Sequence, residues 1–179
     1  MEILKFVLMG LAIFIGLVLI IPLFTKKSIS VKRDIVIEKP KPEVFDFVRL
    51  LKNQDHFSVW ANKDPEMKKE FRGKDGTVGS VSAWDSQLKD LGMGEQEILK
   101  IVDGERIDYE LRFYKPFKAT NYADFTFETI SESETKVSWG FSGRMSYPMN
   151  LFLLIRDIEG MMGNDLYQGL VRLKAVLEK

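Results

Sequence analysis

The sequence predicts an α+β domain in which an antiparallel sheet of about seven strands packs on a long C-terminal helix. One N-terminal transmembrane helix precedes this domain. Three observations predict the class: an uncharged apolar run near the start, a series of segments whose apolar residues alternate with polar ones, and a final segment with helical apolar spacing. Each element is justified in turn below.

Composition excludes several classes of function. The chain has 179 residues, which is the length of one ordinary domain with an appendage. Its 26 basic and 26 acidic residues leave no net basic field to hold nucleic acid. It contains no cysteine and a single histidine, His56, so the usual metal sites and thiol nucleophiles are missing. We therefore predict no metal, no cofactor and no nucleic-acid partner.

The N-terminal run is predicted to cross a membrane. Residues 6–24 contain no charge, and as a helix they would span roughly 29 Å, which matches a bilayer core. A cleaved signal peptide is the competing interpretation, but its apolar stretch is shorter and ends at a small-residue cleavage site, which is missing here. A buried core helix fits less well, because no polar face marks a solvent side.

The flanking charges suggest how the protein is oriented and divided. Lys26, Lys27, Lys32 and Arg33 follow the run, whereas only Lys5 and the amino terminus precede it, and basic residues favour the cytoplasmic side. We expect a single-pass membrane protein with a cytoplasmic domain. The predicted division is a transmembrane helix over residues 3–24, a short linker over 25–30 and one domain over 31–179.

Strand and turn patterns follow the linker. Alternation at residues 31–38 predicts a first strand, and the prolines Pro40 and Pro42 then introduce a helix of about ten residues. Extended runs separated by turn residues predict the remaining strands at residues 67–72, 77–84, 95–102, 106–114, 120–130 and 135–145. Such alternation indicates an antiparallel sheet with one face in water.

The clearest alternation places apolar and charged side chains on opposite faces of residues 106–114. The apolar side is Ile107, Tyr109, Leu111 and Phe113, and the other side is Arg106, Asp108, Glu110 and Arg112. The charged set is predicted to be solvated surface with cross-strand ion pairs.

The C-terminal segment is predicted to be one amphipathic helix that covers the apolar face. Apolar residues recur at i, i+3 and i+4 spacing from Leu151 to Leu177, and Pro148 suits the helix start. Gly160, Gly163 and Gly169 each cost about 1 kcal/mol in a helix. Close approach to the sheet, room for a ligand, or a kink between Gly160 and Gly163 would explain them.

The order of these elements resembles a known superfamily over about residues 31–178. The segments that carry the resemblance are IVIEKP at 35–40 with Val44-Phe45, Trp60 before DPEM at 64–67, GTVG at 76–79 leading to Trp84, GMGEQ at 92–96, ERI at 105–107, TKVSW at 135–139 and GLVRLK at 169–174. Together they resemble the helix-grip fold of the START-like superfamily, also called SRPBCC proteins, in its polyketide cyclase/dehydrase-like branch. That resemblance implies a curved sheet wrapped against the long helix around an apolar cavity for a lipid, polyketide or other hydrophobic molecule. It carries over no catalytic residue set, because the superfamily shares none.

Bulky residues on the predicted apolar faces are the candidate lining of such a cavity, although each also suits a filled core. The candidates are Trp60, Trp84, Tyr109, Phe113, Phe125, Trp139 and Met162.

Three other features carry weaker hypotheses. Glu95 would be an acid or base if its strand pointed it into an apolar cavity, which would raise its pKa. His56 titrates near neutrality but suits a surface loop. Residues 73–79 superficially suggest a phosphate loop, yet they lack its Gly-Lys-Ser/Thr ending and lead into a strand, so a hairpin turn is favoured.

Three functions follow. The first is a membrane-anchored module that binds a small hydrophobic ligand between sheet and helix. The second is a cyclase or dehydratase type of enzyme that uses Glu95 with Tyr109 or Tyr147. The third is a protein-interaction domain with a filled core.

Overall fold

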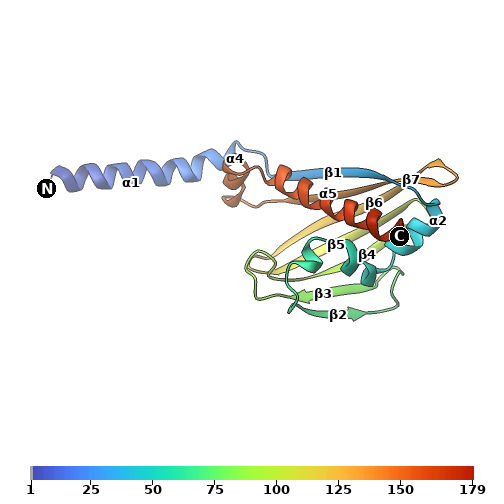
Figure 1. The fold of residues 1–179 in the computed structure, drawn as a ribbon. Coiled ribbons are helices and arrows are strands. Elements are labelled where there is room, and N and C mark those ends of the chain that lie inside the picture. Colours follow the sequence, from blue (N-terminus) through green and yellow to red (C-terminus); the bar gives the residue numbers. More distant parts are fainter. Residues whose placement is uncertain (1) are drawn as a thin grey trace.

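The computed structural model describes residues 2–179 and confirms the predicted α+β class. A long N-terminal helix projects from a curved sheet, and a C-terminal helix crosses one face of that sheet (Figure 1). The helices are α1 (Glu2–Ile20), α2 (Lys41–Val48), α3 (Gln54–Phe57), α4 (Phe152–Ile155) and α5 (Ile158–Leu177), with 3-10 turns η1 (Ile21–Leu23), η2 (Leu51–Asn53), η3 (Trp60–Asn62) and η4 (Met149–Leu151).

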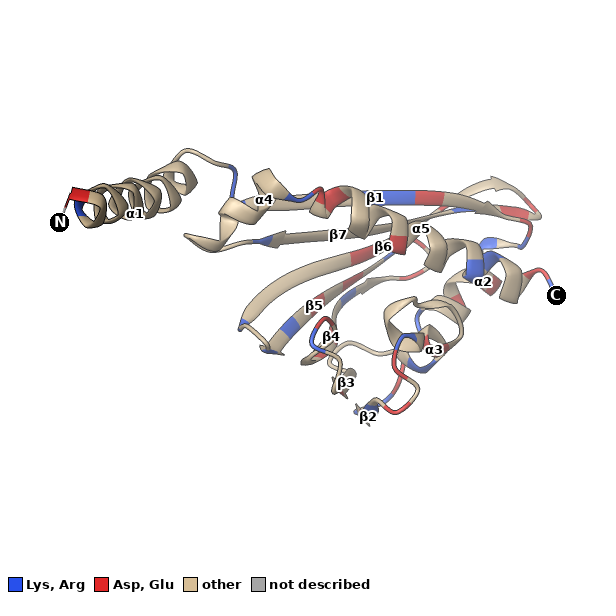
Figure 2. Ribbon diagram, turned by 60° about the vertical axis from the view of Figure 1, so that its left-hand side comes forward, with Lys and Arg blue, Asp and Glu red and all other residues tan. Residues whose placement is uncertain are grey.

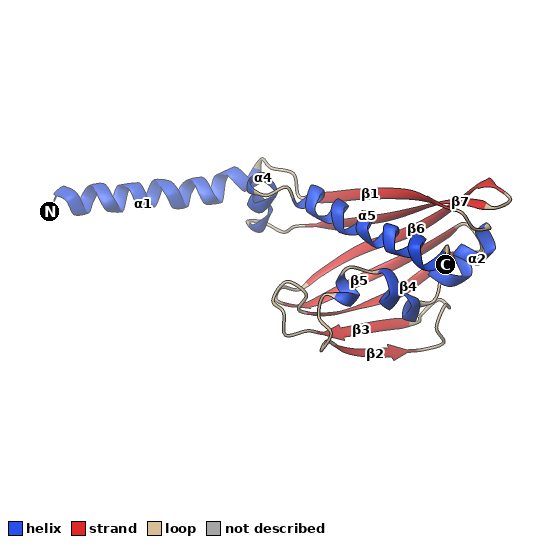
Figure 3. Ribbon diagram, in the orientation of Figure 1, coloured by secondary structure: helices blue, strands red, loops and turns tan. Residues whose placement is uncertain are grey.

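The sheet has seven antiparallel strands in the order β1-β7-β6-β5-β4-β3-β2. Their bounds are β1 (Ser28–Ile37), β2 (Lys68–Arg72), β3 (Val81–Asp85), β4 (Met93–Val102), β5 (Arg106–Lys115), β6 (Ala119–Ser131) and β7 (Glu134–Arg144). β1 and β2 form the two edges, and the layer of helices lies on the inner side of the curve (Figure 3). The predicted strands lie close to these bounds because period-two alternation marks each of them. β1 nevertheless begins at Ser28, inside the segment predicted to be a linker.

The core lies between the sheet and α5. Leu166, Leu170 and Leu173 of α5 are buried against strand residues that include Phe125 and Val137. Each such side chain contributes about 1.5–3 kcal/mol when it is removed from water. This burial is what holds the helix across the sheet.

The prediction of one continuous C-terminal helix is wrong at its beginning. Arg156 has extended backbone, with φ −125° and ψ 138°, and it separates α4 from α5. Asp157 then caps α5, because its Oδ1 accepts a hydrogen bond of 2.8 Å from the Gly160 amide. The break therefore lies before Gly160 and not between Gly160 and Gly163. Leu154 and Ile155, which the helical spacing assigned to the buried face, are exposed.

Close approach to the sheet explains the glycine at residue 169 of α5. A Cβ on Gly169 would lie 2.6 Å from Cζ3 of Trp139 on the sheet, and one on Gly163 would collide with the guanidinium of Arg33. The Arg33 side chain is flexible and can move away, whereas overpacking against the Trp139 ring costs typically 1–3 kcal/mol, more than the ~1 kcal/mol that alanine gains in helix propensity. Glycine at residue 169 lets α5 lie directly on the sheet.

Candidate functional site

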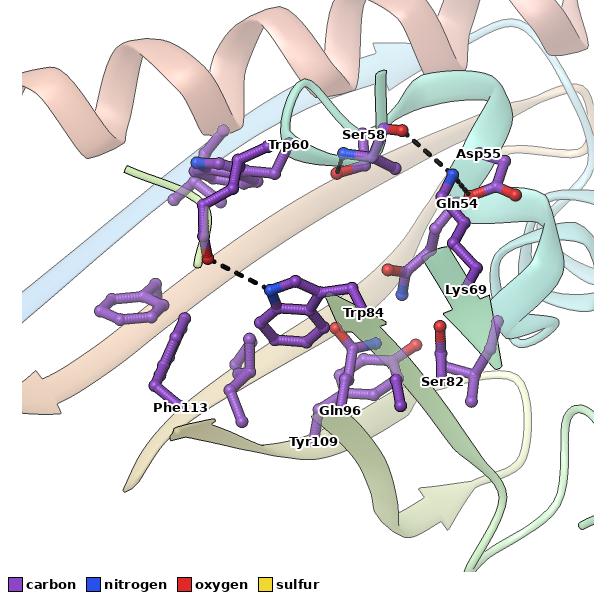
Figure 4. Close-up of a pocket in the computed structure, with 18 of the residues that line it drawn as sticks. Gln54, Asp55, Ser58, Trp60, Lys69, Ser82, Trp84, Gln96, Tyr109 and Phe113 are labelled. Carbon is purple, nitrogen blue, oxygen red and sulfur yellow. Dashed lines mark hydrogen bonds and ion pairs between the residues drawn. The ribbon is translucent and has the colours of Figure 1, made fainter. Parts of the chain in front are cut away.

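A cavity of about 250 Å³ lies between the sheet, α5 and the segment from α3 to η3 (Figure 4). The segment from α3 to η3 follows the short helix α2 and covers the part of the sheet that α5 does not reach (Figure 1). Because β3 to β7 all contribute inward-facing side chains to one curved surface, their apolar faces converge here.

The structure places all seven predicted lining residues on the wall of this cavity. They come from six elements: Trp60 from η3, Trp84 from β3, Tyr109 and Phe113 from β5, Phe125 from β6, Trp139 from β7 and Met162 from α5. Alternation predicted them because residues two apart on a strand share a face. That they contact a ligand remains a prediction.

Aromatic rings form two rigid parts of the wall. Trp139 stacks on Phe125 with ring centroids 4.7 Å apart, and Trp60 meets Trp139 edge-on at 5.8 Å. Across the cavity, Trp84 meets Phe113 edge-on at 5.6 Å, and the Trp84 indole N–H donates to the Leu91 carbonyl at 3.2 Å. Such contacts restrict ring motion, so the cavity is bounded by fixed surfaces.

Two residues of the cavity wall each carry a buried polar atom without a partner. Gln96 Nε2 and the Tyr109 hydroxyl are buried, and neither has a hydrogen-bond partner in the structure. Both residues line the cavity and lie side by side in Figure 4. Burial, followed by the charges of Asp75 and Asp108, raises the pKa of Tyr109, so the hydroxyl is protonated at neutral pH.

An unpaired buried donor costs about 1–3 kcal/mol. A bound molecule with an oxygen acceptor would satisfy these two groups. Sequence reasoning missed Gln96, although it shares a face with Gly94 and Ile98 on β4, and the same alternation identifies it as inward-facing.

Charged residues occupy the cavity rim and pair with one another. Lys69 Nζ donates to Asp55 Oδ1 at 2.8 Å and to the Ala61 carbonyl at 3.0 Å. Asp90, on another side, pairs with Lys63. The hydrogen bond from Lys63 holds the pKa of the Asp90 carboxyl below its ordinary value. The two carboxylates on the cavity wall are therefore ion-paired and not held as buried acids.

The sequence matches no protein-family model and no curated protein. Solved structures match the fold over most of the chain. Aha1 from Colwellia psychrerythraea aligns with a TM-score of 0.58 and 15% identity, covering 84% of this chain and 96% of that chain. Ara h 8.0201 aligns with a TM-score of 0.56 and 9% identity, covering 84% and 98%. The di-domain ARO/CYC BexL from the BE-7585A biosynthetic pathway aligns at 0.58 and 17%, covering 87% of this chain and 52% of its own.

The chain has the START-like helix-grip fold. This assignment confirms the fold that the sequence segments predicted, with the N-terminal helix as an addition. Because the identities are low, the matches establish the helix-grip architecture and leave the function to be argued from the site.

Glu95 was a candidate acid or base only if its strand pointed it into the cavity, and it is not among the residues that line the cavity. Glu95 lies on the outer face of β4, where its carboxylate pairs with Arg72 and accepts a hydrogen bond of 2.8 Å from Arg112 Nε. Partial burial alone would raise the pKa of Glu95, but hydrogen bonds from Tyr114, Arg112 and Arg72 outweigh it and hold the pKa below its ordinary value. The raised pKa that the acid hypothesis needed is therefore not found at Glu95.

The other weak candidates also lie away from the cavity wall. The Tyr147 hydroxyl donates to the Leu19 carbonyl at the end of α1, at 3.0 Å. His56 is exposed on α3 with its ring 6.3 Å from that of Phe47. Residues 73–79 form the turn between β2 and β3, as the hairpin interpretation predicted.

The charged alternation of β5 forms the predicted outer face. Arg106 Nε contacts Asp108 at 2.7 Å, and Arg112 contacts Glu97 and Glu110 at 2.6 Å each. Blue and red bands on β5 in Figure 2 show this alternation along the strand. Within residues 2–179, no group of three or more acidic or histidine side chains is placed to hold a metal ion.

One helix is long and apolar enough to cross a membrane. It covers Glu2–Leu23, and almost all of its side chains are exposed. Its only charges, Glu2 and Lys5, lie in its first turns, as the red and blue bands at its start in Figure 2 show.

Proposed function

We propose that this protein is a membrane-anchored binding module that holds a small hydrophobic ligand between the sheet and α5. The observation that carries the proposal is a mostly apolar cavity whose wall includes Gln96 and Tyr109, each with a buried polar atom that has no hydrogen-bond partner. Apolar walls with a few polar groups are typical of small-molecule sites. The likeness to solved helix-grip structures supports the proposal, because BexL and Ara h 8.0201 share the architecture.

The cavity selects the ligand by size and by one polar function. At about 250 Å³ it is close to the lower end of the usual range for ligand sites, about 300–1,000 Å³. The ligand is therefore a small lipid-like or polyketide-like molecule. It has one carbonyl or hydroxyl oxygen that accepts from the Gln96 amide and bonds the Tyr109 hydroxyl.

We infer that α1 anchors this module in a bilayer. Its apolar side chains are exposed along almost its whole length, and that length suits a hydrocarbon core. The basic residues after α1 favour a cytoplasmic domain. The anchor then corresponds to residues 3–24 and the binding domain to the chain after it.

The test of occupancy is native mass spectrometry of the full-length protein extracted in mild detergent. We expect an additional mass that is released as a hydrophobic molecule on denaturation. Protein that stays empty after extraction, and that also fails to bind N-phenyl-1-naphthylamine, contradicts the proposal.

Filling the cavity should weaken ligand binding without unfolding the domain. Ala123 is buried on the cavity wall, and Ala123→Phe would occupy the space beside Phe125. We expect the dissociation constant for N-phenyl-1-naphthylamine to rise at least about tenfold, or about 1.4 kcal/mol. The matched control is Ala175→Phe on the exposed side of α5, which should bind as the wild type does. Equal loss in both variants would contradict a specific cavity site.

Replacing Gln96 is expected to have opposite effects on the stability of the empty protein and on ligand binding. Gln96→Leu removes a buried donor that has no partner, so the free energy of unfolding of the empty protein should stay level or rise by about 1 kcal/mol. The extracted ligand, which needs that donor, should bind more weakly to the variant. Chemical denaturation and a binding titration measure the two effects. A variant that is both less stable and unchanged in binding would show that Gln96 serves packing alone.

The enzyme alternative receives less support from this geometry. Glu95 lies outside the cavity, and both carboxylates on the cavity wall are paired with lysines. Binding without proton transfer is the function that these residues support best.

A further inference from the structure

The end of the sheet next to α1 collects several loops. Because β1 starts there and all strands are antiparallel, the turn from β5 to β6, the loop from β3 to β4, and the connection from β7 to α5 lie at this same end. Figures 1 and 3 show these loops on the side from which α1 projects.

Exposed apolar side chains gather at this end of the described chain. The turns carry Phe117, which is 68% exposed, and Leu88, and Phe24 follows η1. The connection to α5 adds Met149, Phe152, Leu154 and Ile155. At the opposite end, Val78 lies in the turn between β2 and β3 and Ile130 near the end of β6. An apolar surface concentrated in one place indicates a binding partner.

α4 presents the largest part of this surface. Leu154 and Ile155 are 59% and 68% exposed, and Phe152 beside them is 44% exposed. The break at Arg156 prevents these residues from continuing along α5 onto the sheet. Exposing three large apolar side chains on one short helix is unfavourable in water. The helix is therefore built to contact a nonpolar medium.

A hydrogen-bonded clamp joins α4 to the end of α1. Asn150 lies in η4, the turn directly before α4, and is fully buried; its Nδ2 donates to the Pro22 carbonyl at 2.8 Å and to Thr25 Oγ1 at 2.7 Å. The Tyr147 hydroxyl reaches the Leu19 carbonyl. Because these bonds hold the turn directly before α4 against the turn after α1, α4 lies near the end of the predicted membrane span.

We propose that α4 inserts its exposed apolar side chains into the interfacial region of the same bilayer that α1 crosses. The domain is then docked with one end on the membrane and does not swing on a tether. Arg144 and Arg156 lie on either side of this segment, and Lys115 and Lys118 flank Phe117. Basic and aromatic residues at this level suit the lipid headgroups.

The inference rests on the proposed anchor. It also places the ligand site close to the membrane surface. Phe113 on the cavity wall pairs with Ala119, the last pair before the turn from β5 to β6. The cavity wall thus extends to the docked end, next to a source of hydrophobic ligand.

The absence of cysteine allows a direct test with a single label. Full-length variants Ile155→Cys, Val78→Cys and Phe14→Cys, each labelled with an NBD fluorophore, are reconstituted into phosphatidylcholine and phosphatidylglycerol vesicles. Val78 is 60% exposed and serves as the matched site at the far end. Leu154→Cys is a second α4 site in case one label disturbs folding. Quenching by lipids that carry a doxyl group on the acyl chain is measured.

We expect the α4 label to be quenched and blue-shifted, as the Phe14 label within α1 is, while the Val78 label is neither. If Phe14 is quenched and both α4 sites behave like Val78, the anchor stands and the docking proposal is overturned. If Phe14 is also unquenched, the anchor itself fails, and docking fails with it. Ligand binding in detergent is measured separately, so its outcome does not depend on this result.

Discussion

Replacing Trp139 with alanine is expected to lower the free energy of unfolding by about 3–5 kcal/mol, the usual cost of deleting a buried aromatic ring. The Trp139 ring is stacked on Phe125, contacts Phe57 edge-on at 5.8 Å, and lies against Gly169 of α5. Its removal leaves a void that joins the cavity. Denaturant unfolding of the full-length protein in detergent micelles measures the loss of stability.

The same variant should change which ligands bind. An enlarged cavity is expected to accept probes bulkier than N-phenyl-1-naphthylamine, and a bound probe should recover part of the lost stability. Phe45→Ala is the control, because Phe45 is buried against Phe127 and does not line the cavity. It should destabilise the domain to a similar extent and leave probe selection unchanged. The same change in probe selection for both variants would show that Trp139 has no special role at the site.

Arg112→Leu is expected to destabilise the domain by about 2 kcal/mol at neutral pH. Breaking a fully buried ion pair costs ~3–5 kcal/mol, and the cost is smaller here because Arg112 retains some exposure. The guanidinium contacts Glu95 at 2.8 Å and both Glu97 and Glu110 at 2.6 Å. Its removal leaves three carboxylates facing one another across β4 and β5. Those like charges repel where the wild type has attraction.

The pH dependence of this variant should run opposite to that of the wild type. In the wild type the folded-state pKa of Glu95 is lowered, so its contribution is complete above the ordinary carboxyl value and is lost as pH falls through the folded pKa. In Arg112→Leu, mutual repulsion raises the carboxyl pKa values, and protonation relieves the penalty as pH falls.

Unfolding measured at pH 7.5 and pH 5 should show the difference between wild type and variant shrinking at the lower pH. Arg106→Leu is the control, because Arg106 is more exposed and contacts Asp108 alone within 3 Å. Its effect should be smaller and nearly independent of pH in this range. A constant or growing difference for Arg112→Leu would contradict the role assigned to the cluster.

Much of the site was predictable because a strand alternates its faces. Tyr109, Phe113, Phe125 and Trp139 all occupy inward positions of regular strands, so the pattern that identified the sheet also identified the cavity wall. The same alternation explains why the hypothesis of a Glu95 acid inside the cavity fails. As a neighbour of the inward-facing Gln96, it had to face outward, and the partners that lower its pKa come from two other strands.

The break between α4 and α5 was not predictable from apolar spacing. Leu151, Leu154 and Ile155 continue the helical period of α5 without interruption, and the cap at Asp157 decides where the helix begins. The segment before the break is held by a part of the chain far away in sequence, because Asn150 is hydrogen-bonded to the turn that follows α1. Apolar periodicity shows which residues are apolar, but it does not show which other part of the chain, if any, covers them.

The order of residues by itself determined the strands, the inward and outward faces, the covering helix and the apolar N-terminal segment, because each depends on local periodicity. Only the tertiary structure decided that the faces enclose a cavity with Gln96 and Tyr109 in its wall, and that the turn before α4 is hydrogen-bonded to the turn after α1. Both outcomes depend on how closely separate elements approach, and that distance is set by contacts between residues far apart in the chain, such as Gly169 with Trp139 and Asn150 with Pro22.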